Sequence, residues 1–145
     1  MNILNWFKRK KNTCIDFGAG YNLTDLPIAT FYQGEVKLNF LLDTGSNNNI
    51  LNVSAIENLS YQETNKTSNV FGMDGIDHVC PYCLVDINYK DTHYPAYFMV
   101  CDMKTSFDNI KKETGVTVHG ILGSRFFKEY KSILDFAEFK AYFKK

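Results

Sequence analysis

Apolar and polar residues alternate along several short stretches of the chain, and this period of two is the pattern of half-buried β-strands. Two such stretches, residues 27–32 and 36–40, flank Gln33-Gly34-Glu35 and predict a β-hairpin. Asp74-Gly75 between extended runs predicts a second hairpin. Further strands are expected over residues 50–53, 69–71, 76–79, 83–89, 94–100, 116–118, 133–136 and 140–143. The chain is therefore expected to be mostly β.

Three segments carry the signals of short helices instead. They cover residues 55–59, 106–113 and 124–130. Each follows or begins at a serine that can act as an N-cap: Ser54, Ser106 and Ser124. In the last segment, Phe126, Phe127 and Tyr130 are spaced to face a core. Residues 60–69 are polar and are expected to form a loop.

Composition narrows the classes of function. The 145 residues indicate one domain, and 12 Phe with 9 Tyr suit the half-buried faces of β-sheets. The 16 basic and 16 acidic side chains balance, so no general nucleic-acid binding is expected. No apolar run reaches the roughly 18 residues of a membrane helix, and the N-terminus lacks a signal-peptide pattern. We therefore expect a cytoplasmic protein without a cofactor.

The first twelve residues combine an apolar segment, which includes Trp6 and Phe7, with the basic run Lys8-Arg9-Lys10-Lys11. Such a segment can lie among the headgroups of a membrane. It can also be a solvated tail. We favour the tail, because the segment is too short to hold a membrane tightly by itself.

One stretch combines a strand with candidate chemistry. The apolar run 40–42 ends in Asp43, which is followed by Thr44, Gly45 and Ser46. Gly45 gives the backbone the freedom to bring N–H groups close to the carboxylate, and the hydroxyls of Thr44 and Ser46 are further donors. A strand that delivers an acid into such a turn indicates a carboxylate with a functional role.

A resemblance to aspartic proteases rests first on Leu41-Leu42-Asp43-Thr44-Gly45-Ser46, which matches two apolar residues, Asp-Thr-Gly and a small residue. Residues 119–127, His-Gly-Ile-Leu-Gly-Ser-Arg-Phe-Phe, are similar to the later motif of this fold, an apolar-apolar-Gly run that crosses behind the catalytic loop and feeds a short helix. Residues 70–76 look like a glycine-tipped flap. Because one Asp-Thr-Gly is present, the chain resembles the single-lobed, dimeric retropepsin-like branch, from about residue 23 to 143.

The resemblance implies a fold and a division of the chain. The fold is a closed acid-protease-type β barrel with two or three short helices and one lobe per chain. Residues 1–22 are a tail and lead-in, and residues 23–145 are the retropepsin-like domain.

The resemblance also implies an aspartic endopeptidase, a protease that hydrolyses peptide bonds with water. A homodimer would bring together Asp43 from two subunits as general base and general acid. Thr44 would brace the two loops across the dimer axis, Gly45 would offer its N–H to the carboxylate, and Ser46 would bond the outer carboxylate oxygen. The alternative is a catalytically silent peptide-binding or dimerisation module on the same fold.

The substrate implied by the resemblance is an extended peptide or protein, held by strand-like backbone pairing. A flap over it would consist of Gly72, Met73, Asp74 and Gly75. Its closure would exclude water from the reaction. An ordinary surface hairpin is the other interpretation of this stretch.

Cys80-Pro81-Tyr82-Cys83 lies outside this picture. A C-x-x-C pair can be a redox site or half of a zinc site, for which His78, His93 and Cys101 would be the other ligands. The motif lies between strands and not at the start of a helix, and a second close pair is missing. Two incidental thiols are therefore the favoured interpretation, and no metal site is predicted.

Two other polar residues stand beside apolar runs. His119 precedes the apolar run 121–122, but no serine or cysteine motif accompanies it, so a structural imidazole is expected. Asp135 follows the apolar run 133–134, yet the Thr-Gly turn is missing after it. We therefore reject Asp135 as a second member of the dyad.

Overall fold

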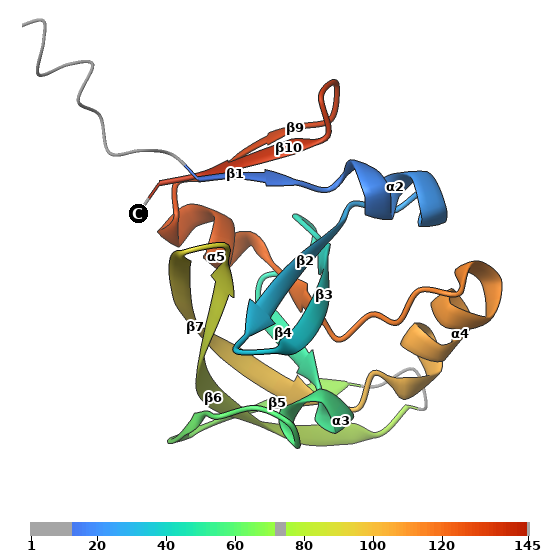
Figure 1. Ribbon diagram of the computed structural model, residues 1–145. Helices are drawn as coiled ribbons and strands as arrows, with labels where there is room; N and C mark the ends of the chain where they lie inside the picture. Colours follow the sequence, from blue (N-terminus) through green and yellow to red (C-terminus); the bar gives the residue numbers. More distant parts are fainter. Residues whose placement is uncertain (1–12, 72–74, 145) are drawn as a thin grey trace, which may run out of the picture.

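The computed structural model describes residues 13–71 and 75–144 of the chain. The N-terminal segment 1–12 and the three predicted flap residues Gly72, Met73 and Asp74 lie outside the described residues. Ten strands and four helices follow one another within the described part, as Figure 1 shows.

Six strands close into a barrel. Their order is β2 (Ile28–Gln33), β3 (Val36–Leu42), β8 (Gly120–Leu122), β4 (Asn49–Asn52), β7 (Thr92–Cys101) and β6 (Asp77–Tyr89), after which β6 returns to β2. The pairs β3–β8 and β4–β7 are parallel, and the others are antiparallel. The predicted fold class, a mostly β closed barrel with short helices and one lobe, is confirmed. Two or three helices were expected, and the described part of the chain has four.

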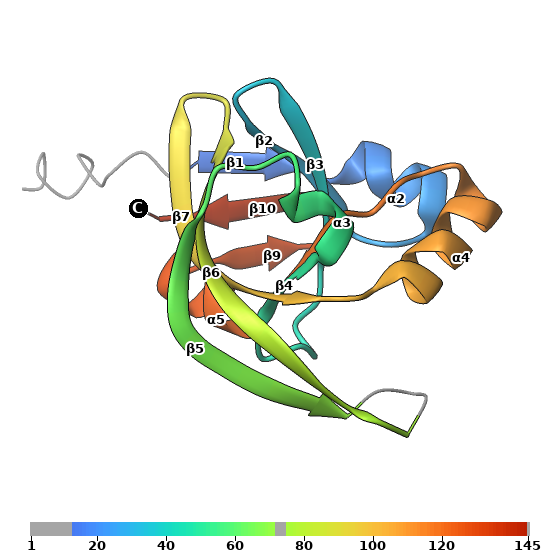
Figure 2. The same ribbon diagram turned by 90° about the horizontal axis from the view of Figure 1, so that it is seen from below.

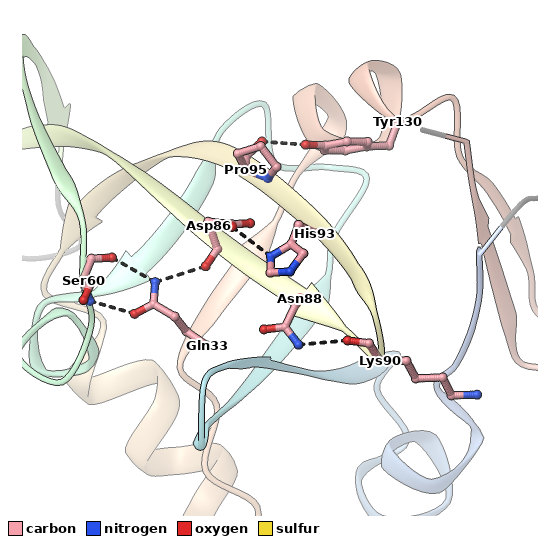
Figure 3. A network of polar contacts seen from close by, with 8 residues as sticks. All are labelled: Gln33, Ser60, Asp86, Asn88, Lys90, His93, Pro95 and Tyr130. Atoms are coloured by element: carbon pink, nitrogen blue, oxygen red, sulfur yellow. Dashed lines mark hydrogen bonds and ion pairs between the residues drawn. The ribbon is translucent and has the colours of Figure 1, made fainter. Parts of the chain in front are cut away.

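The barrel closes at a junction between β2 and β6, where Tyr32 lies opposite Asn88. Beside it, the Gln33 side chain donates to the carbonyls of Ser60 at 2.9 Å and Asp86 at 3.1 Å, and accepts the Ser60 N–H at 2.7 Å (Figure 3). Three bonds from one amide satisfy backbone groups of two other segments. Gln33 therefore stabilises this junction, where β2 and β6 pair through Tyr32 and Asn88.

Aromatic rings fill the space between the barrel and helix α5 (Ser124–Glu129). Phe126 is fully buried, and its ring centroid lies 4.8 Å from that of Tyr130 and 5.4 Å from that of Phe143. Phe31 and Tyr94 meet the same ring at 6.4 and 6.1 Å. Such offset and edge contacts add to the hydrophobic stabilisation of burial. Phe126 and Tyr130 are buried and Phe127 is half-buried, as the helical spacing predicts.

A second sheet contains β1 (Thr13–Asp16), β10 (Lys140–Phe143) and β9 (Ile133–Asp135), in that order. β1 leads into α2 (Gly18–Thr24), so part of the expected lead-in pairs with the last strand of the chain. Figures 1 and 2 show this sheet on the side of the barrel opposite the long hairpin of β5 (Gln62–Phe71) and β6.

The strand β5 corrects one expectation, because residues 60–69 were expected to be a loop. β5 pairs with β6 but contributes almost no buried side chain, since most of its residues are exposed. A strand of this kind needs no apolar face, so its sequence carries no alternation. The expected strand over 116–118 is also wrong, because these residues run as irregular chain into β8.

The helix starts differ from the predicted caps. α3 (Val53–Ile56) and α4 (Lys104–Thr114) begin before Ser54 and Ser106, and their N-caps are Asn52 and Met103. Ser124 is the first residue of α5 and not its cap. Gly115 ends α4 in the left-handed conformation, with φ of 77°. Within the described residues, no helix is long and apolar enough to cross a membrane.

Candidate active site

Asp43 stands at the end of β3, in a turn held by backbone hydrogen bonds. Its N–H donates to the carbonyl of Leu122 at 3.0 Å, and its carbonyl accepts the N–H of Ser46 at 3.2 Å. The N–H of Gly45 donates to the Asp43 carboxylate oxygen Oδ1 at 2.9 Å. The side chain is only half-buried. The turn therefore presents a carboxylate whose orientation is set by its own backbone.

The strand β8 lies directly beside this carboxylate's strand. Leu41 pairs with Ile121 and Leu42 with Leu122, in parallel. The apolar-apolar-Gly run thus passes behind the turn and feeds α5, as the sequence motif predicts. Two distant parts of the sequence are neighbouring strands here, and the register of this pairing fixes the position of Asp43 at the end of β3.

The start of α5 holds the chain that follows Asp43. The N–H of Gly123 donates to Asn49 Oδ1 at 3.0 Å, that of Ser124 to the Ser46 carbonyl at 2.7 Å, and that of Arg125 to the Asn47 carbonyl at 3.3 Å. The first N–H groups of a helix have no partner within the helix. The loop 46–49 supplies these partners, so helix and loop fix one another.

The three residues after Asp43 differ in their exposure and in their hydrogen bonds. Thr44 and Gly45 are exposed, which leaves both open to another molecule. The Ser46 hydroxyl donates to the carbonyl of Asn48 at 2.8 Å. A hydroxyl has one proton to donate, so Ser46 does not direct it to the Asp43 carboxylate. This differs from the role that the resemblance implies for Ser46.

Of the four predicted flap residues, Gly75 alone lies within the described residues, with φ of 78°. The arms on either side form a hairpin, because β5 and β6 pair as far as Phe71 opposite Asp77. The role of Gly72 to Gly75 as a substrate-binding flap stays a prediction.

A polar pocket of about 560 Å³ opens beside the loop that follows Asp43. Its lining comes from the loop, β5, β6, β7 and α5: Asn48, Asn49, Asn65, Lys66, Thr67, Tyr82, Tyr97, Arg125 and Glu129. The Tyr82 hydroxyl donates to Asn48 Oδ1 at 3.3 Å, and among the described residues the Asn48 NH2 group donates no hydrogen bond. Within the described residues, Lys66 and Arg125 make no ion pair.

The other candidate residues have structural surroundings. His119 Nδ1 accepts the N–H of Asn39 at 3.0 Å, and burial together with nearby Lys37 lowers the pKa of this imidazole. Asp135 Oδ1 accepts the N–H groups of Ala137 and Glu138 in the turn after β9. Both side chains therefore make structural hydrogen bonds to backbone N–H groups.

The cysteines of the C-x-x-C motif are not neighbours in space. Cys83 packs in the main core, whereas Cys80 packs with Met99 and Cys101 in a separate cluster. In the described part of the chain, no three His, Cys, Asp or Glu side chains are placed to hold a metal ion together. His93 Nδ1 instead meets Asp86 Oδ2 at 2.9 Å on the surface (Figure 3).

Comparison with known proteins identifies the fold. No family model matches the sequence, and no match is found among curated proteins. Among solved structures, the retroviral protease-like domain of Ddi1 from Leishmania major is similar, with a TM-score of 0.51 and 13% identity. The match covers 83% of this chain and 94% of that one. The fold is retropepsin-like. At this identity the likeness concerns the fold and not the activity.

Sequence reasoning missed the residues that support the Asp43 turn. Asn49 is 5% exposed, and besides accepting the Gly123 N–H it donates to the Tyr97 carbonyl at 3.1 Å. Its only signal in the sequence is a polar residue at the start of an apolar strand. Tyr82 and Arg125 reach the pocket from β6 and α5, and no local pattern links them to Asp43.

Proposed function

We propose that the protein is an aspartic endopeptidase of retropepsin type, a hydrolase that works as a homodimer. In this proposal Asp43 of one subunit faces Asp43 of its partner across a two-fold axis. The observation that carries it is the Asp43 turn: Gly45 N–H lies 2.9 Å from the carboxylate, at the end of a strand that pairs in parallel with β8. The retropepsin-like fold supports it.

The chemistry needs two carboxylates because hydrolysis without a metal needs both a base for water and an acid for the leaving nitrogen. Two close carboxylates cannot both ionise easily, so they share one proton. One chain carries one such turn. A two-fold dimer supplies the second copy through the same surface on both subunits, and the exposed Thr44 and Gly45 of each subunit support an approach from this side.

The pocket beside Asn48 is proposed to take an acidic side chain of the peptide. A run of hydrogen bonds leads from the turn to the pocket: Ser46 N–H to the Asp43 carbonyl, Ser46 hydroxyl to the Asn48 carbonyl, and Tyr82 hydroxyl to Asn48 Oδ1. Lys66 and Arg125 against Glu129 leave the lining with an excess of positive charge. A carboxylate matches this charge and the free Asn48 amide.

The test is cleavage of a fluorogenic peptide library at several pH values and protein concentrations, with wild type and Asp43→Asn compared. We expect activity that favours acid, rises faster than linearly with concentration and is lost in the variant. Asp135→Asn is the matched control, because this acid also ends a strand and accepts N–H groups of the following turn. Equal cleavage by wild type and Asp43→Asn would refute the proposal.

A catalytically silent peptide-binding module is the second candidate. The Ser46 hydroxyl favours it, because its bond to Asn48 leaves the carboxylate with fewer donors than the resemblance implies. A stable dimer in sedimentation that cleaves no peptide, and in which wild type and Asp43→Asn bind peptides equally, would decide for this candidate.

A further inference from the structure

The motif Cys80-Pro81-Tyr82-Cys83 brings its two thiols to different faces of β6. Both cysteines are 5% exposed, but they belong to separate clusters. Successive side chains of a strand point to opposite faces, so residues three apart cannot share one. The thiol that accompanies Cys80 in its cluster belongs instead to Cys101, at the end of β7.

The register of the sheet explains this neighbour. β6 and β7 run antiparallel, with Tyr82 opposite Met99. The ladder ends at this pair, and the same register, continued by two residues along each strand, would bring Cys80 opposite Cys101, which agrees with their common cluster. Directly opposed residues have Cα atoms about 4.5 or 5.5 Å apart. A disulfide needs a Cα separation of about 4.4–6.8 Å, so either kind of position suits one.

The two side chains also interact with each other. Burial raises the pKa of the Cys101 thiol above its ordinary value, and a hydrogen bond and charge interaction with Cys80 raise it further. Both cysteines are free thiols. Their cluster includes Met99, and Val70 of the neighbouring β5 packs against it. Two reduced sulfurs therefore meet in an apolar site under the β5–β6 hairpin.

We propose that Cys80 and Cys101 form a reversible disulfide site, oxidised by a peroxide, which links the β5–β6 hairpin covalently to β7. One thiolate attacks a peroxide oxygen, becomes a sulfenic acid and releases hydroxide, which is protonated to water. The second thiol attacks that sulfur, the S–S bond forms, and the sulfenic oxygen leaves as water. The thiols lose two electrons, and one peroxide becomes two waters. Two equivalents of a small external thiol, or one dithiol, reduce the bond through a mixed disulfide and are themselves oxidised to a disulfide.

The position of the bond gives it an effect on the hairpin. The pairing of β6 with β7 extends to Tyr82, whereas β6 itself continues to Asp77 and pairs there with β5. A bond at Cys80 would extend the attachment to β7 beyond Tyr82, toward the hairpin end. Because buried thiols react slowly, we expect this pair to be oxidised more slowly than the exposed Cys14 is modified.

The experiment maps the cross-link in the full-length wild-type protein. The protein is incubated with hydrogen peroxide, its remaining thiols are alkylated in denaturant, and peptides are analysed without reduction by mass spectrometry. We expect a peptide pair containing Cys80 and Cys101, about 2 Da lighter than the two reduced peptides, and its disappearance after dithiothreitol. A Cys80–Cys83 link, or alkylation of both Cys80 and Cys101, would overturn the proposal.

A matched pair of variants tests the pairing independently. Cys83→Ser removes a cysteine of the same strand and equal exposure, and the Cys80–Cys101 link should persist. Cys80→Ser should abolish it. Hydrogen exchange tests the effect on the hairpin: the amides of Val79, Cys80 and Tyr82 should exchange more slowly in the oxidised protein. Unchanged exchange would overturn the proposed effect of the disulfide on the hairpin. The cross-link mapping in the wild-type protein does not depend on whether the variants fold.

Discussion

Replacement of Gly123 by alanine tests the contact between α5 and the loop after Asp43. A Cβ at this position would lie 2.4 Å from the Asn48 carbonyl oxygen and 2.6 Å from that of Ser46. Both are backbone atoms, so no side-chain rotation relieves the clash. The φ of Gly123 is −99°, which any residue adopts, so the expected cost comes from the contact alone.

The expected loss of stability has two parts, the steric clash and the hydrogen bonds between α5 and the loop. Real Cβ contacts are not shorter than 3.0 Å, so the loop must retreat by roughly 0.6 Å, an overpacking that costs about 1–3 kcal/mol. The retreat also stretches the bonds from Gly123, Ser124 and Arg125 to the loop, now 3.0, 2.7 and 3.3 Å. Loss of one of them adds about 1 kcal/mol. The free energy of unfolding should fall by about 2–4 kcal/mol.

Urea unfolding of Gly123→Ala against wild type measures this loss, and peptide cleavage measures the displacement of Asp43. Gly115→Ala is the control: its φ of 77° strains an alanine, but in the described part of the chain no atom beyond its sequence neighbours lies within 4 Å of the added Cβ. It should cost about 1–2 kcal/mol and leave cleavage unchanged. A free energy of unfolding of Gly123→Ala within about 0.5 kcal/mol of the wild-type value would refute the expected clash.

Three further predictions concern single side chains. Burial holds the pKa of His119 below the usual 6.5, so the unfolded chain takes up the proton first, and the free energy of unfolding should fall as the pH drops below 6.5. In His119→Asn, which cannot titrate, the free energy of unfolding should depend less on pH. The same pH dependence in this variant and wild type would contradict the prediction. In cleavage or binding assays, Arg125→Glu should lower the preference for acidic over neutral peptides by up to about fivefold, the limit for an exposed charge pair. Lys128→Glu, on the same helix but outside the pocket, should leave this preference unaltered. Equal effects of both variants would contradict the binding of acidic side chains in the pocket. Phe126→Ala should destabilise the protein by about 3–5 kcal/mol in thermal or urea unfolding, and the half-buried Phe127 less; the reverse order would contradict the packing.

The features that the sequence predicted are those whose local signals agree with the tertiary structure. The hairpin of β2 and β3 shows alternation on both strands and a glycine between them, and Gly34 adopts φ of 59° there. The Asp43 turn and the later apolar-apolar-Gly run were found separately, and the structure pairs them as neighbouring strands. In both cases a few adjacent residues are enough to determine the backbone.

The features that were missed depend on partners far away in the sequence. β1 is a strand because Thr13 to Asp16 pair with Phe143 to Lys140 at the other end of the chain. Cys80 and Cys83 were interpreted as two incidental thiols, whereas Cys80 packs in one cluster with Cys101 of β7. No window of the sequence contains both members of such a pair, so a local pattern cannot reveal them.

The polarity of β5 has a consequence for the protein at high concentration. β5 stands at the end of the strand order, and an edge strand offers unpaired N–H and C=O groups to any other chain. Its exposed Glu63 and Lys66 place charges on this edge, and the register shift between Glu63 and Thr67 interrupts the flat surface that a second strand would need. The residues that made β5 look like a loop thus protect the protein from aggregation through this edge.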